Sequence, residues 1–175
     1  KYSLLVIFIS ILGFKANTKI PEKYKIETSL PKCKGTDFNK WTDCYGEYKF
    51  PRIEYKGEWK DGAFHGQGIL KEAWGDVYVG GFVMNKAEGF GKQDMYQHGE
   101  MVGSFEGELK NDFLNGKGYW EQDGCRYEGT FIDHRLNGEG KITCDDGYQA
   151  KGLYKDDQLN GQGFESWGNG TVYEG

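Results

Sequence analysis

The sequence predicts an all-β fold: an elongated, single-layer antiparallel sheet of tandem β-hairpin repeats, with a short irregular N-terminal segment. Three observations support this prediction: excess glycine, high aromatic content and a repeating motif. The 175-residue chain contains 28 Gly and 16% aromatic residues, whereas an ordinary globular chain has about 7% Gly. Disorder does not fit a chain with so many aromatics and only 3 Pro, and the glycines lack the every-third spacing of collagen.

Residues 1–16 are expected to be a signal peptide or an N-terminal anchor. The run from Leu4 to Phe14 is almost wholly apolar, but about 18 such residues are needed for a membrane-spanning helix. A run of this shorter length is typical of a signal peptide. Ala16 is a candidate for the residue before cleavage, although Phe14 departs from the small-residue pattern, so an uncleaved anchor stays open. We therefore expect an exported chain, periplasmic or extracellular.

Residues 17–54 are expected to form an N-terminal cap that contains a disulfide loop and half a repeat. Cysteines of an exported protein commonly pair, and the pairing placed first joins Cys33 to Cys44 and Cys125 to Cys144. Buried thiols remain the alternative for the second pair. No metal site is expected, because zinc needs about four ligands and Cys33 and Cys44, with ten residues between them, lack the CxxC spacing and a nearby histidine.

Residues 55–175 contain five repeats and the start of a sixth. The five align without gaps over their first fourteen positions, and the second carries about four extra residues around 96–102. The chain begins without Met and stops early in the sixth unit, so we expect both ends to lie within a longer protein. The units start at Tyr55, Tyr78, Phe105, Tyr127, Ala150 and Tyr173.

Each unit is predicted to be one hairpin. Its first five positions alternate aromatic, polar, Gly, polar, aromatic, as in Tyr55, Gly57 and Trp59, which is the period of a half-buried strand. A polar turn, a Gly-x-Gly pair and a second strand follow, and turn signals such as Asn-Gly separate the units. The inward residues of the second strands are predicted to be Leu70, Met95, Trp120, Ile142 and Trp167.

The glycines are expected to have two roles. A strand glycine costs about 0.5–1 kcal/mol relative to Ala, so those at 57, 80, 107, 129 and 152 are expected where a neighbouring ring lies over bare backbone. The later pairs are expected to supply positive φ or a bulge. The framework residues are Tyr55, Gly57, Trp59, Gly66 and Gly68; Tyr78, Gly80, Phe82, Gly89 and Gly91; Phe105, Gly107, Gly116 and Gly118; Tyr127, Gly129, Phe131, Gly138 and Gly140; and Gly152, Tyr154, Gly161 and Gly163.

The motif Y-x-G-x-W-x-x-G-x-x-x-G-x-G, which runs from Tyr55 to Gly68, resembles the MORN repeat (membrane occupation and recognition nexus). The resemblance implies an elongated, twisted sheet of consecutive hairpins. Such repeats occur in junctional membrane proteins, plant phosphatidylinositol phosphate kinases and cytoskeletal scaffolds, so the family implies fold more than function. Departures from the motif are expected to thin the ladder of rings: Asn85, Asp112, His134 and Asp157 in place of Gly62, Leu109 at the aromatic fifth position, and Ala150 at the first.

The sequence does not indicate an enzyme. His65, His98 and His134 fall at unrelated repeat positions, and neither a nucleophile elbow nor a phosphate-binding loop occurs. The Gly-x-Gly pairs lack the third glycine and the following helix of a dinucleotide site. No cofactor is therefore expected. A net charge of −5 disfavours nucleic-acid binding.

The function predicted is a non-catalytic interaction or scaffold module, whose rigid, repeated β surface binds protein partners or itself. Two alternatives stay open. One is attachment to a phospholipid surface, which the missing polybasic cluster disfavours. The other is an accessory repeat region of a longer, truncated enzyme.

Overall fold

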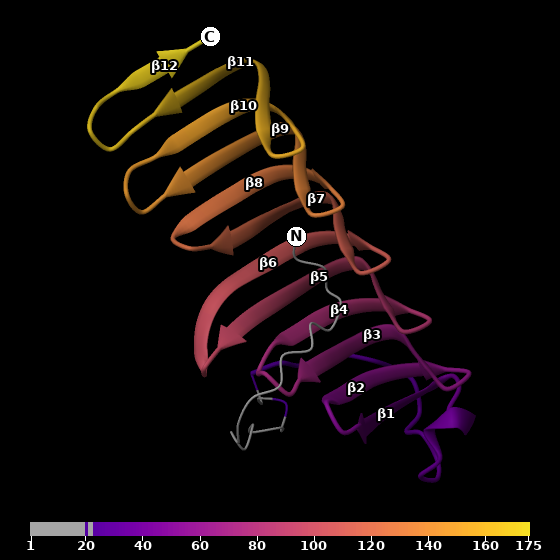
Figure 1. Ribbon diagram of the computed structural model, residues 1–175. Helices are drawn as coiled ribbons and strands as arrows, with labels where there is room; N and C mark the ends of the chain where they lie inside the picture. Colours follow the sequence, from indigo (N-terminus) through magenta and orange to yellow (C-terminus); the bar gives the residue numbers. More distant parts are fainter. Residues whose placement is uncertain (1–19, 21–22) are drawn as a thin grey trace.

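The protein forms one open sheet of consecutive antiparallel strands (Figure 1). The computed structural model describes Ile20 and residues 23–175, so the prediction for residues 1–16 lies outside the described residues. Within the described part there is no α-helix, and the predicted all-β class is confirmed. The elements are η1 (Phe38–Lys40, a 3-10 helix), β1 (Cys44–Lys49), β2 (Ile53–Lys60), β3 (Ala63–Glu72), β4 (Val77–Val83), β5 (Lys86–Gln97), β6 (Glu100–Lys110), β7 (Phe113–Gln122), β8 (Cys125–Ile132), β9 (Arg135–Cys144), β10 (Gln149–Lys155), β11 (Gln158–Ser166) and β12 (Val172–Glu174).

Each repeat is one hairpin, as predicted: β2–β3, β4–β5, β6–β7, β8–β9 and β10–β11. Every hairpin turns through two residues that both have positive φ, such as Asp61 and Gly62, because this geometry matches the twist of the flanking strands. The extra residues of the second repeat form no loop. They lengthen β5 and β6, which His98 and Gly99 connect.

One face of the sheet carries Tyr55, Gly57 and Trp59, and we call it the ring face; the other, with Ile69 and Val77, is the reverse face. A row of glycines crosses the ring face, one per strand from β1 to β11, each paired with the next. Gly175 extends the row by exchanging backbone hydrogen bonds with Gly163. The row contains Gly46, Gly57, Gly68, Gly80, Gly91, Gly107, Gly118, Gly129, Gly140, Gly152 and Gly163.

The prediction that both glycines of each Gly-x-Gly pair supply positive φ or a bulge is wrong for the second glycine. Only the first has positive φ, for example 58° at Gly66. At that point β3 bulges: Gly57 pairs with Gly68 but Glu58 pairs with His65. Gly68 belongs instead to the glycine row, where a Cβ would lie 2.5 Å from the Tyr55 ring. The five second glycines thus make room for a side chain, as the strand glycines do.

Leu70, Met95, Trp120 and Ile142 lie on the ring face as predicted, whereas Trp167 follows the end of β11 and is 38% exposed. Leu70, Trp120 and Ile142 lie directly across from the first aromatic of their repeats. In the second and fifth repeats that position holds Gln93 and Glu165. Met95 and Trp167 lie two residues further on, so polar side chains interrupt the row of rings at two places.

The residues that depart from Gly62 join consecutive repeats, a role that the sequence did not reveal. The backbone N–H of Asn85 donates to the carbonyl of Phe64 (2.9 Å), and its side-chain oxygen accepts from the Phe64 N–H (2.8 Å). Asp112, His134 and Asp157 make the same two bonds to Ala87, Leu114 and Leu136. Asn and Asp tolerate positive φ and accept a hydrogen bond, so these side chains satisfy the turn and the junction together.

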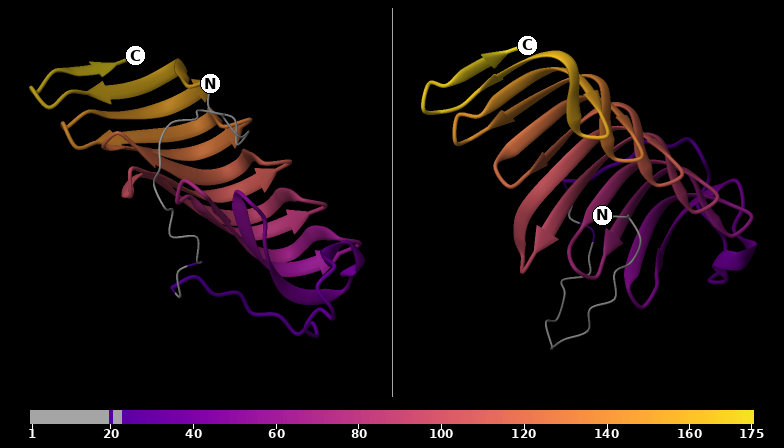
Figure 2. Two further views of the ribbon diagram at one scale, coloured as in Figure 1. Left: turned by 60° about the horizontal axis from the view of Figure 1, so that its bottom comes forward. Right: turned by 45° about the horizontal axis from the view of Figure 1, so that its top comes forward.

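The N-terminal segment covers the first strands on three sides (Figure 2). Residues 23–31, here the strap, cross the reverse face, where Tyr24 and Lys23 bond to Asp94 and Thr28 bonds to Glu58. Residues 31–33 pair with the outer edge of β1. On the ring face, η1 and the following Trp41 pack against Trp59, with centroids of the two indoles 5.0 Å apart. The edge of β1 is therefore not open.

Candidate functional site

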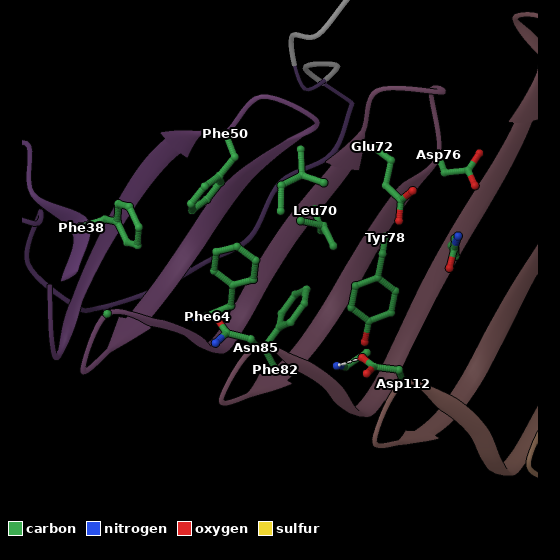
Figure 3. A pocket seen from close by; sticks show the side chains of 14 residues that line it. Phe38, Phe50, Phe64, Leu70, Glu72, Asp76, Tyr78, Phe82, Asn85 and Asp112 are labelled. Atoms are coloured by element: carbon green, nitrogen blue, oxygen red, sulfur yellow. Dashed lines mark hydrogen bonds between the residues drawn. The ribbon is translucent and has the colours of Figure 1, made fainter. Parts of the chain in front are cut away.

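A pocket of about 470 Å³ lies on the ring face of the first two repeats, here the ring pocket (Figure 3). Strands β2 to β5, η1 and the β1–β2 connection contribute to it. Its aromatic side chains lie between two polar ends, one with Glu72 and Asp76 and the other with Asn85 and Asp112. The lining consists of Phe38, Phe50, Ile53, Gly62, Phe64, Leu70, Glu72, Asp76, Tyr78, Phe82, Asn85, Ala87, Gln93 and Asp112.

The aromatic wall is fixed by close ring packing. Phe64 stacks on Tyr55 with centroids 3.9 Å apart, and Phe50 and Phe82 meet Phe64 edge-on. The Tyr78 hydroxyl donates to the carbonyl of Gly81 (3.1 Å), which holds the ring over the glycine row. Offset and edge-on contacts of this kind favour one arrangement of the rings, so the wall is preformed.

Two carboxyl groups lie at one polar end of the ring pocket, at the ends of β3 and β4 that meet in a turn. The N–H of Glu72 donates to the carbonyl of Asp76 (2.9 Å). Burial raises the pKa of both side chains, and the charge of Asp76 raises the pKa of Glu72 further. A proton or a cation that neutralises one of these carboxylates would therefore stabilise the pair.

Gln93 adds a third polar group. It lies across from Tyr78 on β5 and is only 5% exposed, and its Oε1 has no hydrogen-bond partner. The two other polar residues of the lining are already engaged: Asn85 and Asp112 accept the junction bonds described above. The pocket thus holds two carboxylates and the Oε1 of Gln93 as acceptors, of which Asp76 already accepts the N–H of Tyr96 through Oδ1 (2.7 Å).

A second hollow, of about 450 Å³, lies over β6 to β9 and differs in its charges. Arg126 lies 3.7 Å from the centre of the Tyr119 ring and forms ion pairs with Glu121 and Glu128. The Arg126 cation is thus already matched by two carboxylates, and the remaining acid of the lining, Asp145, is exposed to solvent.

The predicted cysteine pairs are present: disulfides join Cys33 to Cys44 and Cys125 to Cys144. The first ties the N-terminal segment to β1, and the second closes the open end of the β8–β9 hairpin. Disulfides of this kind are typical of an oxidising compartment.

The three histidines lie apart and have unrelated surroundings. His98 is exposed in the β5–β6 turn. His134 accepts the Leu114 N–H through Nδ1 (3.3 Å), and burial lowers its pKa. Across Ile20 and residues 23–175, no group of three or more His, Cys, Asp or Glu side chains is arranged to hold a metal ion. A membrane-spanning helix is likewise not found in that part of the chain.

The sequence did not predict that Glu72, Asp76 and Gln93 line one pocket. Glu72 and Asp76 flank a turn signal, where acidic residues are ordinary, and Gln93 falls where the repeat pattern expects an apolar residue. That exception was the available signal: a polar residue on the buried face of a strand requires a partner.

The repeats are similar in sequence to a known repeat family and to part of a larger protein. The sequence profile of the family described as MORN repeat matches residues 55–77, 78–94, 105–126, 127–147 and 151–172. Alsin from Rattus norvegicus is 31% identical over 125 residues, which cover 65% of this chain and 7% of that protein. Alsin from Mus musculus and from Homo sapiens are 31% identical over 117 residues, or 60% of this chain and 7% of each protein. The chain thus spans a small part of these relatives.

Proposed function

Because this chain belongs to the MORN repeat family, we propose that it is a non-catalytic interaction module whose ring face binds a segment of another protein or of a second copy. The observation that carries the proposal is the ring pocket: a hollow of about 470 Å³ whose closely packed rings lie on the same face as Glu72, Asp76 and Gln93. Apolar pockets with a few placed polar groups are the usual form of binding sites.

The proposal includes the cell compartment. Two disulfides suit an oxidising environment, and the apolar run between Leu4 and Phe14 is typical of an export signal. We therefore place the repeats in the periplasm or outside the cell, with residues 17–54 as their cap.

Site-specific photocrosslinking of the full chain tests the proposal. The photoreactive residue p-benzoylphenylalanine replaces either Phe50, in the ring pocket, or Lys117, which is exposed on the reverse face of β7. We expect discrete protein adducts, identified by mass spectrometry, from position 50 and much weaker ones from position 117. Equal labelling at both positions contradicts the proposal. So does flotation with anionic vesicles without protein adducts, which supports the phospholipid alternative.

A second candidate is an accessory repeat region of a larger polypeptide. It is favoured by the matches to Alsin, in which the corresponding residues make up 7% of each protein. Sequencing the transcript across both ends of this region tests it: a continuous frame into another domain supports it, and stop signals close to both ends contradict it.

A further inference from the structure

The ring pocket contains a pair of like charges with a defined geometry. Leu70 on β3 pairs with Tyr78 on β4, and Lys71 pairs with Val77, so Glu72 and Asp76 are the next pair in register. Directly opposed side chains of an antiparallel pair have Cβ atoms about 4.5–5.5 Å apart. Figure 3 shows both carboxyl groups on the side of the pocket that contains Tyr78.

Neither carboxyl group takes part in an ion pair among the described residues; those pairs involve Asp94, Asp37, Glu121, Glu128 and Asp156. Like charges placed opposite each other on a sheet are destabilising. Both groups are partly buried, so solvent screens their repulsion less than at an exposed position. The arrangement is therefore complementary in charge to a cation.

Gln93 supplies a third acceptor and a second, independent indication of a ligand. Its side chain is more than nine-tenths buried and lines the same pocket, yet its Oε1 has no partner. A buried acceptor without a partner is unfavourable, because folding has removed it from water without replacing its hydrogen bond. Since Asp76 and Gln93 flank Tyr78 on the ring face, one donor group above that ring is within reach of both.

The aromatic wall specifies the shape of the cation. Leu70 and Tyr78 lie next to the two carboxyl groups, and Phe82 and Phe64 line the pocket beyond them; these side chains suit an apolar stem. Tyr and Phe rings also attract an ammonium group within about 6 Å of their centres. A lysine side chain combines a four-carbon stem with an ammonium that has three donors and no acceptor, and its donors match the three acceptors of the pocket.

We propose that the ring pocket binds the lysine side chain of an extended segment of a partner protein, with the ammonium on Glu72, Asp76 and Gln93 and the stem against the rings. This inference rests on the proposed function, because it names the group of the partner that the ring face recognises. It also gives the unpaired acceptors of the first two repeats a common role.

The experiment titrates the full chain with two blocked peptides, acetyl-Val-Lys-Val-amide and its norleucine counterpart, which has a similar stem and no charge. Binding is followed by the shifts of backbone amide signals in NMR. We expect saturable shifts at residues of the ring pocket. The lysine peptide should bind about tenfold more tightly, because only its ammonium can form hydrogen bonds to the charged carboxylates. Equal affinity for the two peptides, or no saturable binding of the lysine peptide, overturns the inference.

The double variant Glu72→Gln, Asp76→Asn tests the residues themselves. The amide introduced in place of the Asp76 carboxylate would still offer an oxygen to the Tyr96 N–H, which now bonds to Asp76 at 2.7 Å. The turn should therefore stay folded, as a circular dichroism melt can check. We expect about tenfold weaker binding of the lysine peptide and no change for norleucine. The matched control is Glu139→Gln, an exposed acid on β9 that leaves the ring pocket intact. Unchanged lysine binding in the double variant overturns the inference.

The same double variant separates this inference from the proposed function. If it still forms the position-50 adduct with a partner protein in full yield, the lysine site is wrong and the interaction module stands. If the wild-type chain forms no such adduct, the proposed function itself fails.

Discussion

The first two repeats and the last three use different side chains to cover the same glycine row. Tyr55 and Tyr78 lie over their own glycines, so a Cβ at Gly80 would come within 2.4 Å of the Tyr78 hydroxyl. In the later repeats Leu114, Leu136 and Leu159, from the second strand of each hairpin, take that place. The prediction that a ring covers every strand glycine is therefore wrong for three repeats.

The difference follows from the tenth position of the repeat. Phe64 holds that position in the first repeat and stacks on Tyr55, while Ala87 in the second is too short to reach the glycines. Leucine in the other three is long and flexible enough to do so. The glycine row itself is common to both regions, because paired strands approach closely there: a Cβ at Gly107 would lie 2.6 Å from the Cα of Gly118.

The two regions also differ in what covers them. Tyr55 packs against Trp59, Phe64 and Phe82 and is fully buried, whereas Tyr127 at the same position of the fourth repeat is only half-buried. Each repeat thus covers its glycines with one side chain, and the neighbouring rings decide how deeply Tyr55 or Tyr127 is buried.

The largest expected effect comes from removing a covering leucine. Leu114→Ala should lower the free energy of unfolding by about 3–5 kcal/mol, since Leu114 is fully buried. Leu136→Ala recreates the Tyr–Ala combination of the second repeat, so Tyr127 can turn over the glycines, and we expect a loss about 1 kcal/mol smaller. Urea unfolding of both variants measures the difference. Equal losses would show that the tyrosine cannot replace leucine.

Adding a methyl group in the glycine row should distinguish glycines covered by a tyrosine ring from glycines covered by leucine. Gly68→Ala places a Cβ 2.5 Å from the buried Tyr55 ring, and we expect about 2–3 kcal/mol of destabilisation from overpacking. Gly163→Ala meets the end of Leu159 at 3.0 Å, which can move, so about 1 kcal/mol or less is expected. Both positions have ordinary φ. Thermal melts compare them, and a larger loss at 163 would contradict the distinction between ring and leucine covers.

The junctions between repeats should matter equally in both regions. Asn85→Ala and Asp157→Ala each remove the acceptor of one buried backbone N–H and should each cost about 1–2 kcal/mol. Amide hydrogen exchange at Phe64 and Leu136, whose N–H groups lose that partner, locates the effect. If exchange accelerates across the whole sheet, the repeats unfold as one unit; local acceleration indicates separable units.

The smallest effect concerns the junction that uses histidine. Burial lowers the pKa of His134 below its ordinary value of 6.5, so below that pH the unfolded chain binds a proton that the folded chain resists. His134 thus stabilises the fold fully above pH 6.5, and this stability is lost as the pH falls from there toward the lowered pKa. His134→Asn keeps an acceptor without a charge. As the pH falls, the melting temperature of wild type should decrease more than that of the variant. A difference that stays constant with pH contradicts a lowered pKa for His134.

The local architecture could be predicted because each signal acts over short sequence distances. Alternation fixes the ring face, and a two-residue turn fixes each hairpin. The sequence did not reveal the residues that join consecutive repeats: Asn85, Asp112, His134 and Asp157. Each bonds to the preceding repeat, whereas aligning the repeats compares equivalent positions and does not show contacts between units. Gln93 and Glu165 were missed because the prediction assumed an apolar residue at the inward position of each second strand and therefore chose Met95 and Trp167.

By itself, the sequence determined the number of hairpins, their order, the ring face and the cysteine pairs placed first. Those properties depend on side-chain period and turn chemistry, which are local. Only the tertiary structure decided which side chain covers each glycine pair, where the strap lies, and that Glu72, Asp76 and Gln93 share one pocket. Such choices depend on how neighbouring strands and distant segments compete for the same space, and that competition is resolved only when the sheet is assembled.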